Sequence, residues 1–411
     1  MSVPGGQGPS LCWVNQFALL PAEGGGTRHF ELGRELVRRG WSVDIAASDF
    51  HLHKRAYSRR ADGGDHREIV EPVDGVTMHW IWAAAYRHND WRRAMNWLTF
   101  ARSARALHRT LKRPDVVIGS SPQLFAASAG RSLARAFGVP FVFEVRDLWP
   151  ESLEAAGSGR GLSYRVLARI ADGLYRDADR ILVLAQGTAD YLAERGVPRD
   201  KLLYVPNGVD VHAVHPASHE RTADMPFTVI YAGAHGAANG LDALLDAAER
   251  LGAASGVRFV LVGDGPAKQA LRDDATRRGL THVAFRDAVS KPQLVKMLGE
   301  ADAGLMILRE APLFAFAVSP NKLFDYLAVA LPVVCNVPGD VQRMVAESGG
   351  GEQARDSSGV ALAEAIAAMR ARSVAERRAM GHAGRSWVTR EHSREVLGGR
   401  LDEQLRALLG R

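Results

Sequence analysis

Residues 319–328 (Ser-Pro-Asn-Lys-Leu-Phe-Asp-Tyr-Leu-Ala) combine residue types that could do chemistry together. The pattern predicts a helix start, with Ser319 as N-cap, Pro320 at the first helical position and apolar residues at helical spacing behind them. A helix N-terminus suits a phosphate, because its N–H groups are unpaired and its partial charge is positive. Lys322 adds a cation, and Asp325 lies one turn deeper on the same face. This arrangement suits a nucleotide diphosphate and its ribose; the alternative is a solvated pair on a surface helix.

Other candidates lie directly after predicted strands. The strand at 227–231 runs into the glycine-rich loop 232–240, and the strand at 257–262 ends in Gly-Asp-Gly-Pro. The strand at 140–145 is followed by Arg146 and Asp147. Charges at the carboxyl end of a buried parallel strand lie where open α/β sheets bind ligands. Arg146 and Asp147 are therefore site candidates, with a structural salt bridge as the alternative.

The first predicted strand, 11–14, leads into a loop with three consecutive glycines, Gly24 to Gly26. Such glycines let a ligand or another backbone approach closely, although a flexible turn is the alternative. The spacing Gly-x-Gly-x-x-Gly is missing from both glycine loops. This argues against a plain NAD-dependent Rossmann enzyme.

The elements that must position these loops alternate between strand and helix, which predicts parallel sheets covered by helices on both faces. At 411 residues the chain is too long for one ordinary core. We predict a first Rossmann-like domain at 1–208 and a second at 209–387, with a polar linker near 211–226. A C-terminal helix at 388–411 is predicted to pack back on the first domain.

Composition sets broad limits. Apolar residues make up 46% of the chain and charged residues 24%, as in soluble globular proteins. The net charge of +6 permits an acidic partner, but nothing beyond it supports nucleic acid, so none is predicted. The N-terminus has no apolar signal core, and no run reaches the length of a membrane span. Cys12 and Cys335 are read as buried strand thiols of a reducing compartment, so we predict a cytoplasmic protein.

Residues 91–113 form a predicted helical stretch with seven Lys or Arg residues and no acidic residue, interleaved with apolar side chains. A basic amphipathic helix of this kind can lie on an anionic membrane, here the inner face. The alternative is a helix packed on a sheet with solvated arginines.

Taken together, the motifs resemble family 4 retaining glycosyltransferases, whose GT-B fold has two facing Rossmann-like domains with a cleft between them. The matching motifs are spread over most of the chain and occur in the same order as in the family. It is carried by the Gly24–Gly26 loop, Pro206-Asn207-Gly208-Val209-Asp210, Tyr231-Ala232-Gly233, Gly263-Asp264-Gly265-Pro266 and residues 319–334. Arg146-Asp147-Leu148-Trp149-Pro150-Glu151 and Ser319-Pro320-Asn321-Lys322 resemble a bacterial subgroup that transfers amino-sugars, such as fucosamine, in O-antigen and surface-polysaccharide assembly.

This resemblance implies a donor site in the second domain. Lys322, the adjoining N–H groups and the loop at 233–236 would hold the diphosphate, and Asp325 the ribose. Arg286 or Ala288 would flank the base. The implied donor set is Gly233, His235, Gly236, Asn239, Gly263, Asp264, Gly265, Arg286, Ala288, Ser319, Pro320, Asn321, Lys322, Leu323 and Asp325.

In the first domain the resemblance implies an acceptor side. Asp147 would hold or deprotonate the acceptor, or orient the donor sugar, and is counted with Lys322 as catalytic. The implied set is Glu23, Gly24, Gly25, Gly26, Arg146, Asp147 and Asn207. No metal and no cofactor are predicted, because helix N-termini and a lysine can stabilise the leaving diphosphate.

One departure from the family concerns its two glutamates, separated by seven residues. Asp325 matches the second position, but the first falls on Ala317, which cannot bind a hydroxyl. The predicted activity is retaining transfer of a sugar, an amino-sugar by the subgroup, from a UDP-sugar to a glycan, lipid-linked or small-molecule acceptor. The alternatives are a GT-B nucleotide-sugar epimerase or hydrolase, and a catalytically weak partner subunit that binds nucleotide-sugar.

Overall fold

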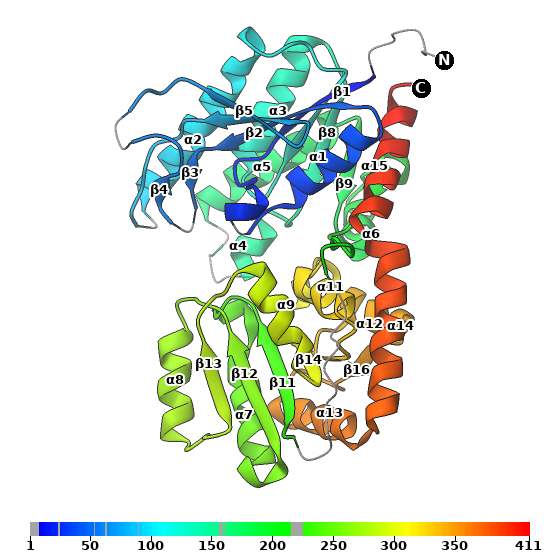
Figure 1. The fold of residues 1–411 in the computed structure, drawn as a ribbon. Helices are drawn as coiled ribbons and strands as arrows, with labels where there is room; N and C mark the ends of the chain where they lie inside the picture. The colour runs from blue at the N-terminus through cyan, green and yellow to red at the C-terminus, as the bar shows by residue number, and fades with distance from the viewer. Residues whose placement is uncertain are drawn as a thin grey trace. The chain divides into compact units, whose positions relative to one another are not determined.

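The computed structural model describes residues 8–23, 25–52, 54–61, 64–88, 90–155, 159, 161–214 and 225–411. The chain divides into two compact units, one made of residues 1–205 and 397–411 and the other of residues 206–396. The predicted divisions at 208 and 387 lie three and nine residues from these boundaries. Each unit is a sheet with helices on both faces (Figure 1).

The first unit is built on an eight-stranded sheet in the order β10-β9-β8-β7-β1-β2-β6-β5. All neighbouring strands are parallel except the edge pair β5 and β6. Its strands are β1 (Ser10–Val14), β2 (Ser42–Ser48), β5 (Ile69–Val73), β6 (Val76–Ile81), β7 (Val116–Ser120), β8 (Phe141–Val145), β9 (Arg180–Val183) and β10 (Leu202–Tyr204). Its helices are α1 (Arg28–Arg38), α2 (Trp91–Ala106), α3 (Leu124–Phe137), α4 (Glu151–Ala155), α5 (Leu162–Asp177) and α6 (Gln186–Glu194).

The second unit has a six-stranded, wholly parallel sheet in the order β13-β12-β11-β14-β15-β16. The strands are β11 (Phe227–Ala232), β12 (Val257–Val262), β13 (Val283–Arg286), β14 (Ala303–Met306), β15 (Val333–Cys335) and β16 (Gly351–Gln353). The helices are α7 (Leu241–Leu251), α8 (Lys268–Arg277), α9 (Lys291–Gly299), α10 (Pro312–Phe316), α11 (Asn321–Ala328), α12 (Asp340–Ser348), α13 (Gly359–Ala371) and α14 (Val374–His392). These two sheets confirm the predicted Rossmann-like architecture.

The C-terminal helices differ from the sequence prediction. α14 begins at a capping box of Ser373 and Glu376 and continues through Gly381 to His392, so the start of the predicted C-terminal helix at 388–411 belongs to α14. A β-carbon on Gly381 would lie 1.9 Å from the carbonyl oxygen of Ala330, so this glycine allows close packing instead of ending the helix. The following helix, α15 (Arg394–Leu408), places three buried leucines in the core of the first unit, namely Leu397, Leu401 and Leu405.

Residues 49–74, although polar in sequence, contain regular structure. They hold the antiparallel pair β3 (Phe50–His51) and β4 (Ala56–Tyr57) as well as the edge strand β5. Pro72 lies within β5, where its missing N–H is tolerated because the strand is at the edge of the sheet.

Candidate functional site

Two loops of the second unit meet at the carboxyl ends of β11 and β12. The N–H of Gly233 donates to the carbonyl oxygen of Val262 at 3.0 Å, and the N–H of His235 donates to that of Asp264 at 2.8 Å. A β-carbon on Gly263 would lie 1.9 Å from the carbonyl oxygen of Gly233, and Gly263 adopts a φ of +145°. Only glycine fits such a contact and conformation. The two predicted glycine loops therefore form one layered backbone surface.

Lys322, in the first turn of α11, reaches this surface. Its ammonium donates to the Asn239 Oδ1 at 2.9 Å and to the Tyr231 hydroxyl at 3.2 Å, and lies 4.6 Å from the centre of the Tyr231 ring. No carboxylate of the described residues lies within ion-pair distance of it. Protein surrounds the ammonium on most sides, and this loss of water lowers the pKa of Lys322 to about 8. Lys322, Asn239 and Gly233 are thus brought together as predicted.

The start of α11 differs by one residue from the prediction. Pro320 is the N-cap, the helix begins at Asn321, and no side chain caps its first turn. Ser319 was expected to be the cap, but its hydroxyl accepts the backbone N–H of Asn207 at 2.9 Å. The Asn207 amide also donates to the Ser319 carbonyl oxygen at 2.7 Å. Asn207, assigned to the acceptor side, therefore binds the predicted donor segment.

Three of the predicted donor residues are positioned differently from expectation. Leu323 is fully buried in the core of the second unit, so its side chain cannot meet a ligand. His235 is also fully buried, and neither ring nitrogen has a hydrogen-bond partner among the described residues. Burial and the charge of Lys268 lower the pKa of His235. Asp325 is partly exposed but forms an ion pair with Lys291 at 2.5 Å. A ribose would have to displace Lys291 from this carboxylate.

The loops after β12 and β13 are joined by Lys268, which the sequence reading missed. Its ammonium donates to the carbonyl oxygens of Gly263 at 2.8 Å and Arg286 at 3.1 Å, and pairs with Asp287 at 2.6 Å. Three more of the predicted donor residues, Asp264, Arg286 and Ala288, have exposed side chains. A lysine three residues after a Gly-Asp-Gly turn is the only sequence signal for this contact.

In the first unit, Arg146 and Asp147 directly follow β8. The Ser121 hydroxyl accepts their N–H groups at 2.8 and 3.3 Å, which fixes the turn. Both residues and Gly26 line a cavity of about 210 Å³. The Nε of Arg146 is buried with no hydrogen-bond partner, and no described carboxylate lies within ion-pair distance of its guanidinium. The rest of the lining is mainly apolar or amide: Gln16, Phe17, Leu19, Ser48, Phe50, His51, Leu52 and Pro122.

Glu23 does not line this cavity. Its carboxylate pairs with Arg59 at 2.9 Å and accepts the N–H of Leu20 at 3.0 Å, which indicates a structural role for a residue predicted to meet the ligand. Gly24 lies outside the described residues. Gly25 adopts a φ of +94°, and a β-carbon on Gly26 would lie 2.8 Å from the carbonyl oxygen of Phe17.

A buried polar cluster beneath this turn was also missed. Glu144 binds Arg28 at 3.0 Å, His29 at 2.8 Å and the Ser120 hydroxyl at 2.5 Å. Burial alone would raise the pKa of Glu144, but His29 and Arg28 outweigh it and hold that pKa well below its usual range. Burial lowers the pKa of His29 to about 4. The signal in the sequence was a single acid inside an otherwise apolar strand.

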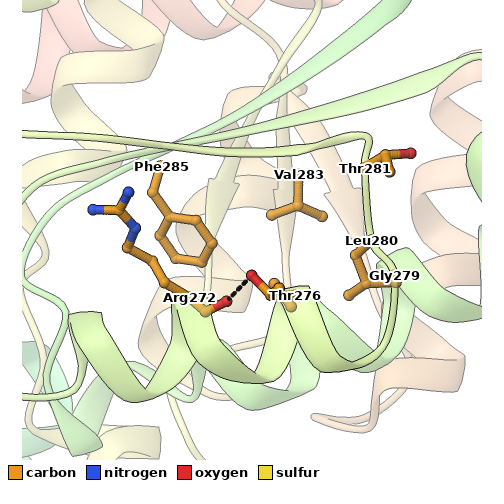
Figure 2. Close-up of a pocket in the computed structure, with 8 residues that line it drawn as sticks. Arg272, Thr276, Gly279, Leu280, Thr281, Val283 and Phe285 are labelled. Carbon is orange, nitrogen blue, oxygen red and sulfur yellow. Dashed lines mark hydrogen bonds between the residues drawn. The ribbon is translucent and has the colours of Figure 1, made fainter.

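Two larger cavities of the second unit contain none of the predicted site residues. One, of about 350 Å³, lies between α8 and β13 and is lined by side chains such as Thr276, Val283 and Phe285 (Figure 2). The other, of about 530 Å³, lies at the ends of β14, β15 and β16 around Leu308, Phe314 and Val337.

Within the described ranges, no group of three or more His, Cys, Asp or Glu side chains is arranged to hold a metal ion. Among the same residues, no helix combines the length and the apolar character needed to cross a bilayer.

Comparison with known proteins gives two family matches. The family described as "Glycosyl transferase 4-like domain" matches residues 23–208. The family described as "Glycosyl transferases group 1" matches residues 226–371. The two matches together extend over most of the chain.

Curated relatives are similar over part of their length. The putative colanic acid biosynthesis glycosyl transferase WcaI of Escherichia coli is 29% identical over 231 residues, which cover 53% of this chain and 56% of that protein. The probable glycosyltransferase WbjE of Pseudomonas aeruginosa is 26% identical, over 62% of this chain and 66% of its own. The 2-deoxystreptamine N-acetyl-D-glucosaminyltransferase of Streptomyces fradiae is 31% identical, over 45% and 47%. The alignments thus span about half to two thirds of these relatives.

Solved structures are similar over nearly the whole chain. Sucrose-phosphate synthase from Thermosynechococcus elongatus has a TM-score of 0.76 at 18% identity, covering 98% of this chain and 99% of that one. Anabaena HepE in complex with UDP and glucose has a TM-score of 0.68 at 15% identity, covering 97% and 99%. At these identities the likeness establishes the fold, which is GT-B.

Proposed function

This chain belongs to the family 4-like glycosyltransferases of the GT-B fold, and we propose that it transfers a sugar from a nucleotide diphosphate donor to an acceptor hydroxyl. The observation that carries this proposal is the Lys322 ammonium. It lies without a carboxylate partner among the described residues, beside the Gly233 loop and in the uncapped first turn of α11. When the bond to the sugar breaks, negative charge grows on the leaving diphosphate. A fixed cation and unpaired N–H groups stabilise that charge.

For the donor we propose a UDP-sugar, and an amino-sugar within that class. The support is indirect: HepE was solved with UDP and glucose, and the Streptomyces relative is named for N-acetylglucosaminyl transfer. A thermal-shift screen of nucleoside diphosphates and their sugars would identify the base and the sugar. Selective stabilisation by a GDP-sugar would overturn the uridine assignment.

For the acceptor we propose that a hydroxyl-bearing glycan, lipid-linked sugar or small molecule binds at the 210 Å³ cavity of the first unit, beside Arg146 and Asp147. The exposed Asp147 carboxylate would hold or deprotonate the acceptor hydroxyl. Transfer is proposed to proceed with retention and without metal. An NMR spectrum of the first-formed product would show the anomeric configuration, and activity should persist in EDTA. Inversion, or loss of activity in EDTA, would contradict these two points.

The central experiment compares Lys322→Ala with Lys296→Ala, which removes an exposed lysine on α9. Loss of a fixed cation should lower kcat/KM by about 10²–10³-fold. UDP affinity should fall as well, while the Lys296 variant should behave as wild type. Unchanged kinetics for Lys322→Ala would refute the proposed site. Nucleotide release that does not depend on acceptor would favour the epimerase or hydrolase alternative, and donor binding without turnover would favour the partner-subunit alternative.

We further propose that α2 contacts an anionic membrane. Trp91, Met95 and Leu98 are 69%, 41% and 46% exposed, at the spacing of one helical face, and exposed arginines at 102, 105 and 109 continue that spacing. Replacing the three arginines with glutamine should weaken binding to phosphatidylglycerol vesicles by about 1 kcal/mol for each charge. Arg250→Gln, on the second unit, is the control. If both variants bind the vesicles equally well, α2 is a helix packed on the sheet and the membrane contact is refuted. The cytoplasmic location stays a prediction.

A further inference from the structure

Lys322 is held by two neutral acceptors that come from different parts of the second unit. Asn239 lies at the end of the glycine-rich loop, where its backbone N–H donates to the carbonyl oxygen of Gly236 at 3.0 Å. Tyr231 is the next-to-last residue of the strand β11 and is fully buried. Neither residue carries a charge that could neutralise the ammonium.

The hydrogen-bond direction at Tyr231 is fixed by its second partner. A phenol has one O–H to donate, and the Tyr231 hydroxyl donates it to the carbonyl oxygen of Ala234 at 2.8 Å. Toward Lys322, which has only donors, it acts as an acceptor at 3.2 Å. The same hydroxyl therefore orders the loop backbone and holds the ammonium.

An ammonium has three N–H donors, and Tyr231 and Asn239 account for two. The Lys322 side chain runs alongside Gly233, where an added β-carbon would lie 3.4 Å from its Cε and 2.9 Å from the Tyr231 hydroxyl. The absence of a side chain at Gly233 leaves room beside the cation. One N–H donor of the ammonium therefore has no partner among the described residues.

We propose that Tyr231 and Asn239 are positioning residues that hold the Lys322 ammonium by neutral acceptors, so that its charge and one N–H stay available to the donor diphosphate. This inference rests on the function proposed above. A carboxylate in either place would compete with the diphosphate for the cation. Without these acceptors the flexible lysine stem would have many conformations, and part of the binding free energy would be lost in ordering it.

The test uses Tyr231→Phe and Asn239→Asp, each checked for an unchanged fold by thermal unfolding. Calorimetry gives UDP affinity between pH 7.5 and 9.5, where the terminal phosphate of UDP is fully ionised. Uridine affinity is measured by displacement of UDP. Tyr326→Phe is the matched comparison, because the Tyr326 hydroxyl accepts the Ala232 N–H of the same loop at 2.8 Å and has no described contact with Lys322.

At pH 7.5, Tyr231→Phe and Asn239→Asp should each lower UDP affinity about tenfold, the value of a hydrogen bond to a charged group, and leave uridine affinity unchanged. Wild-type UDP affinity should fall as pH rises past the Lys322 pKa of about 8. In Asn239→Asp the new carboxylate raises that pKa, so the fall should begin at higher pH. Tyr326→Phe should lower thermal stability but leave the ratio of UDP to uridine affinity and the pH of the fall as in wild type.

The inference is overturned if Tyr231→Phe and Asn239→Asp bind UDP as wild type does, if they weaken UDP and uridine equally, or if Tyr326→Phe shifts the pH dependence in the same way. Lys322→Ala separates this failure from failure of the proposed function. Wild-type UDP affinity in Lys322→Ala would refute the diphosphate site itself. Weak UDP binding there, with normal binding in both positioning variants, would refute only the roles of Tyr231 and Asn239.

Discussion

Replacing Gly263 with alanine should damage the second unit and its nucleotide site together. The new β-carbon would lie 1.9 Å from the carbonyl oxygen of Gly233, whereas ordinary contacts begin at 3.4 Å. The two loops must therefore move apart by about 1.5 Å. That movement strains the hydrogen bonds that join Gly233 to Val262 and Gly263 to Arg286, at 3.0 and 3.2 Å.

These contacts determine how much free energy of unfolding the Gly263→Ala variant should lose. A side chain at positive φ costs about 1–2 kcal/mol, and leaving one buried backbone group unpaired costs about 1–3 kcal/mol. A total near 3 kcal/mol is expected. For a unit of this size, about 2–4 °C of melting temperature is lost per kcal/mol, so the second unit should melt about 6–12 °C lower. A displacement of this size beside a binding group should also weaken UDP at least tenfold.

Gly279→Ala is the matched control. Gly279 lies in the same unit at a φ of +66°, but nothing lies within 4 Å of its added β-carbon. The Gly279→Ala variant should lose only the free energy that a side chain at positive φ costs, about 1 kcal/mol, and should bind UDP as the wild type does. Thermal unfolding gives the melting temperatures of the two variants, and calorimetry gives their UDP affinities. Equal melting temperatures for the two alanine variants, or wild-type UDP affinity in Gly263→Ala, would refute the close approach of the loops.

Three further outcomes are expected. Asp325→Ala should weaken both uridine and UDP in calorimetry if Asp325 holds the ribose, and equal affinity would remove that role. Burial alone lowers the pKa of His79, but hydrogen bonds and charges from Asp44 and Glu68 outweigh it and raise the pKa from 6.5 to about 9. Because the raised pKa belongs to the folded state, this stabilisation is complete below pH 6.5 and is lost as pH rises through 9; thermal melts should show this loss in wild type and a flatter profile in His79→Gln. Leu401→Ala should destabilise the first unit by about 2–5 kcal/mol, and an unchanged melt would mean that α15 adds nothing to that core.

The sequence predicted the architecture because hydrophobic periodicity and glycine loops are local signals. β15 is a continuous apolar run, and β8 is apolar except for Glu144; the turns that follow such strands reach the sheet edge wherever the sheet is parallel. β5 and β16 were missed for opposite reasons. β5 lies in a polar segment and contains a proline, whereas β16 has only three residues and no apolar run. β5 pairs with β6 across the two-residue turn at Asp74 and Gly75, so it lacked an apolar signal although its partner is close in sequence, whereas β16 pairs with β15 across the whole of α12.

At the candidate site, the sequence predicted which backbone segments come together better than it predicted what each side chain contacts. Lys322 and the two glycine loops lie together, because glycine and a helix start constrain the backbone locally. The roles of His235, Leu323 and Glu23 required knowing which direction each side chain takes, and no spacing rule gives that. His235 turns into the interior and Glu23 turns to Arg59, a partner 36 residues away.

Whether a basic side chain is paired with a carboxylate cannot be read from composition. The chain has 52 Lys and Arg residues, and a sequence reading cannot tell which of them are neutralised by carboxylates. Lys322 and Arg146 have no carboxylate within ion-pair distance among the described residues, and each lies at the carboxyl edge of its own sheet. A partly buried cation without a counter-ion lowers stability, as the depressed pKa of Lys322 also indicates. For Lys322 this cost agrees with the proposed donor site, where the diphosphate would supply the missing counter-ion when it binds.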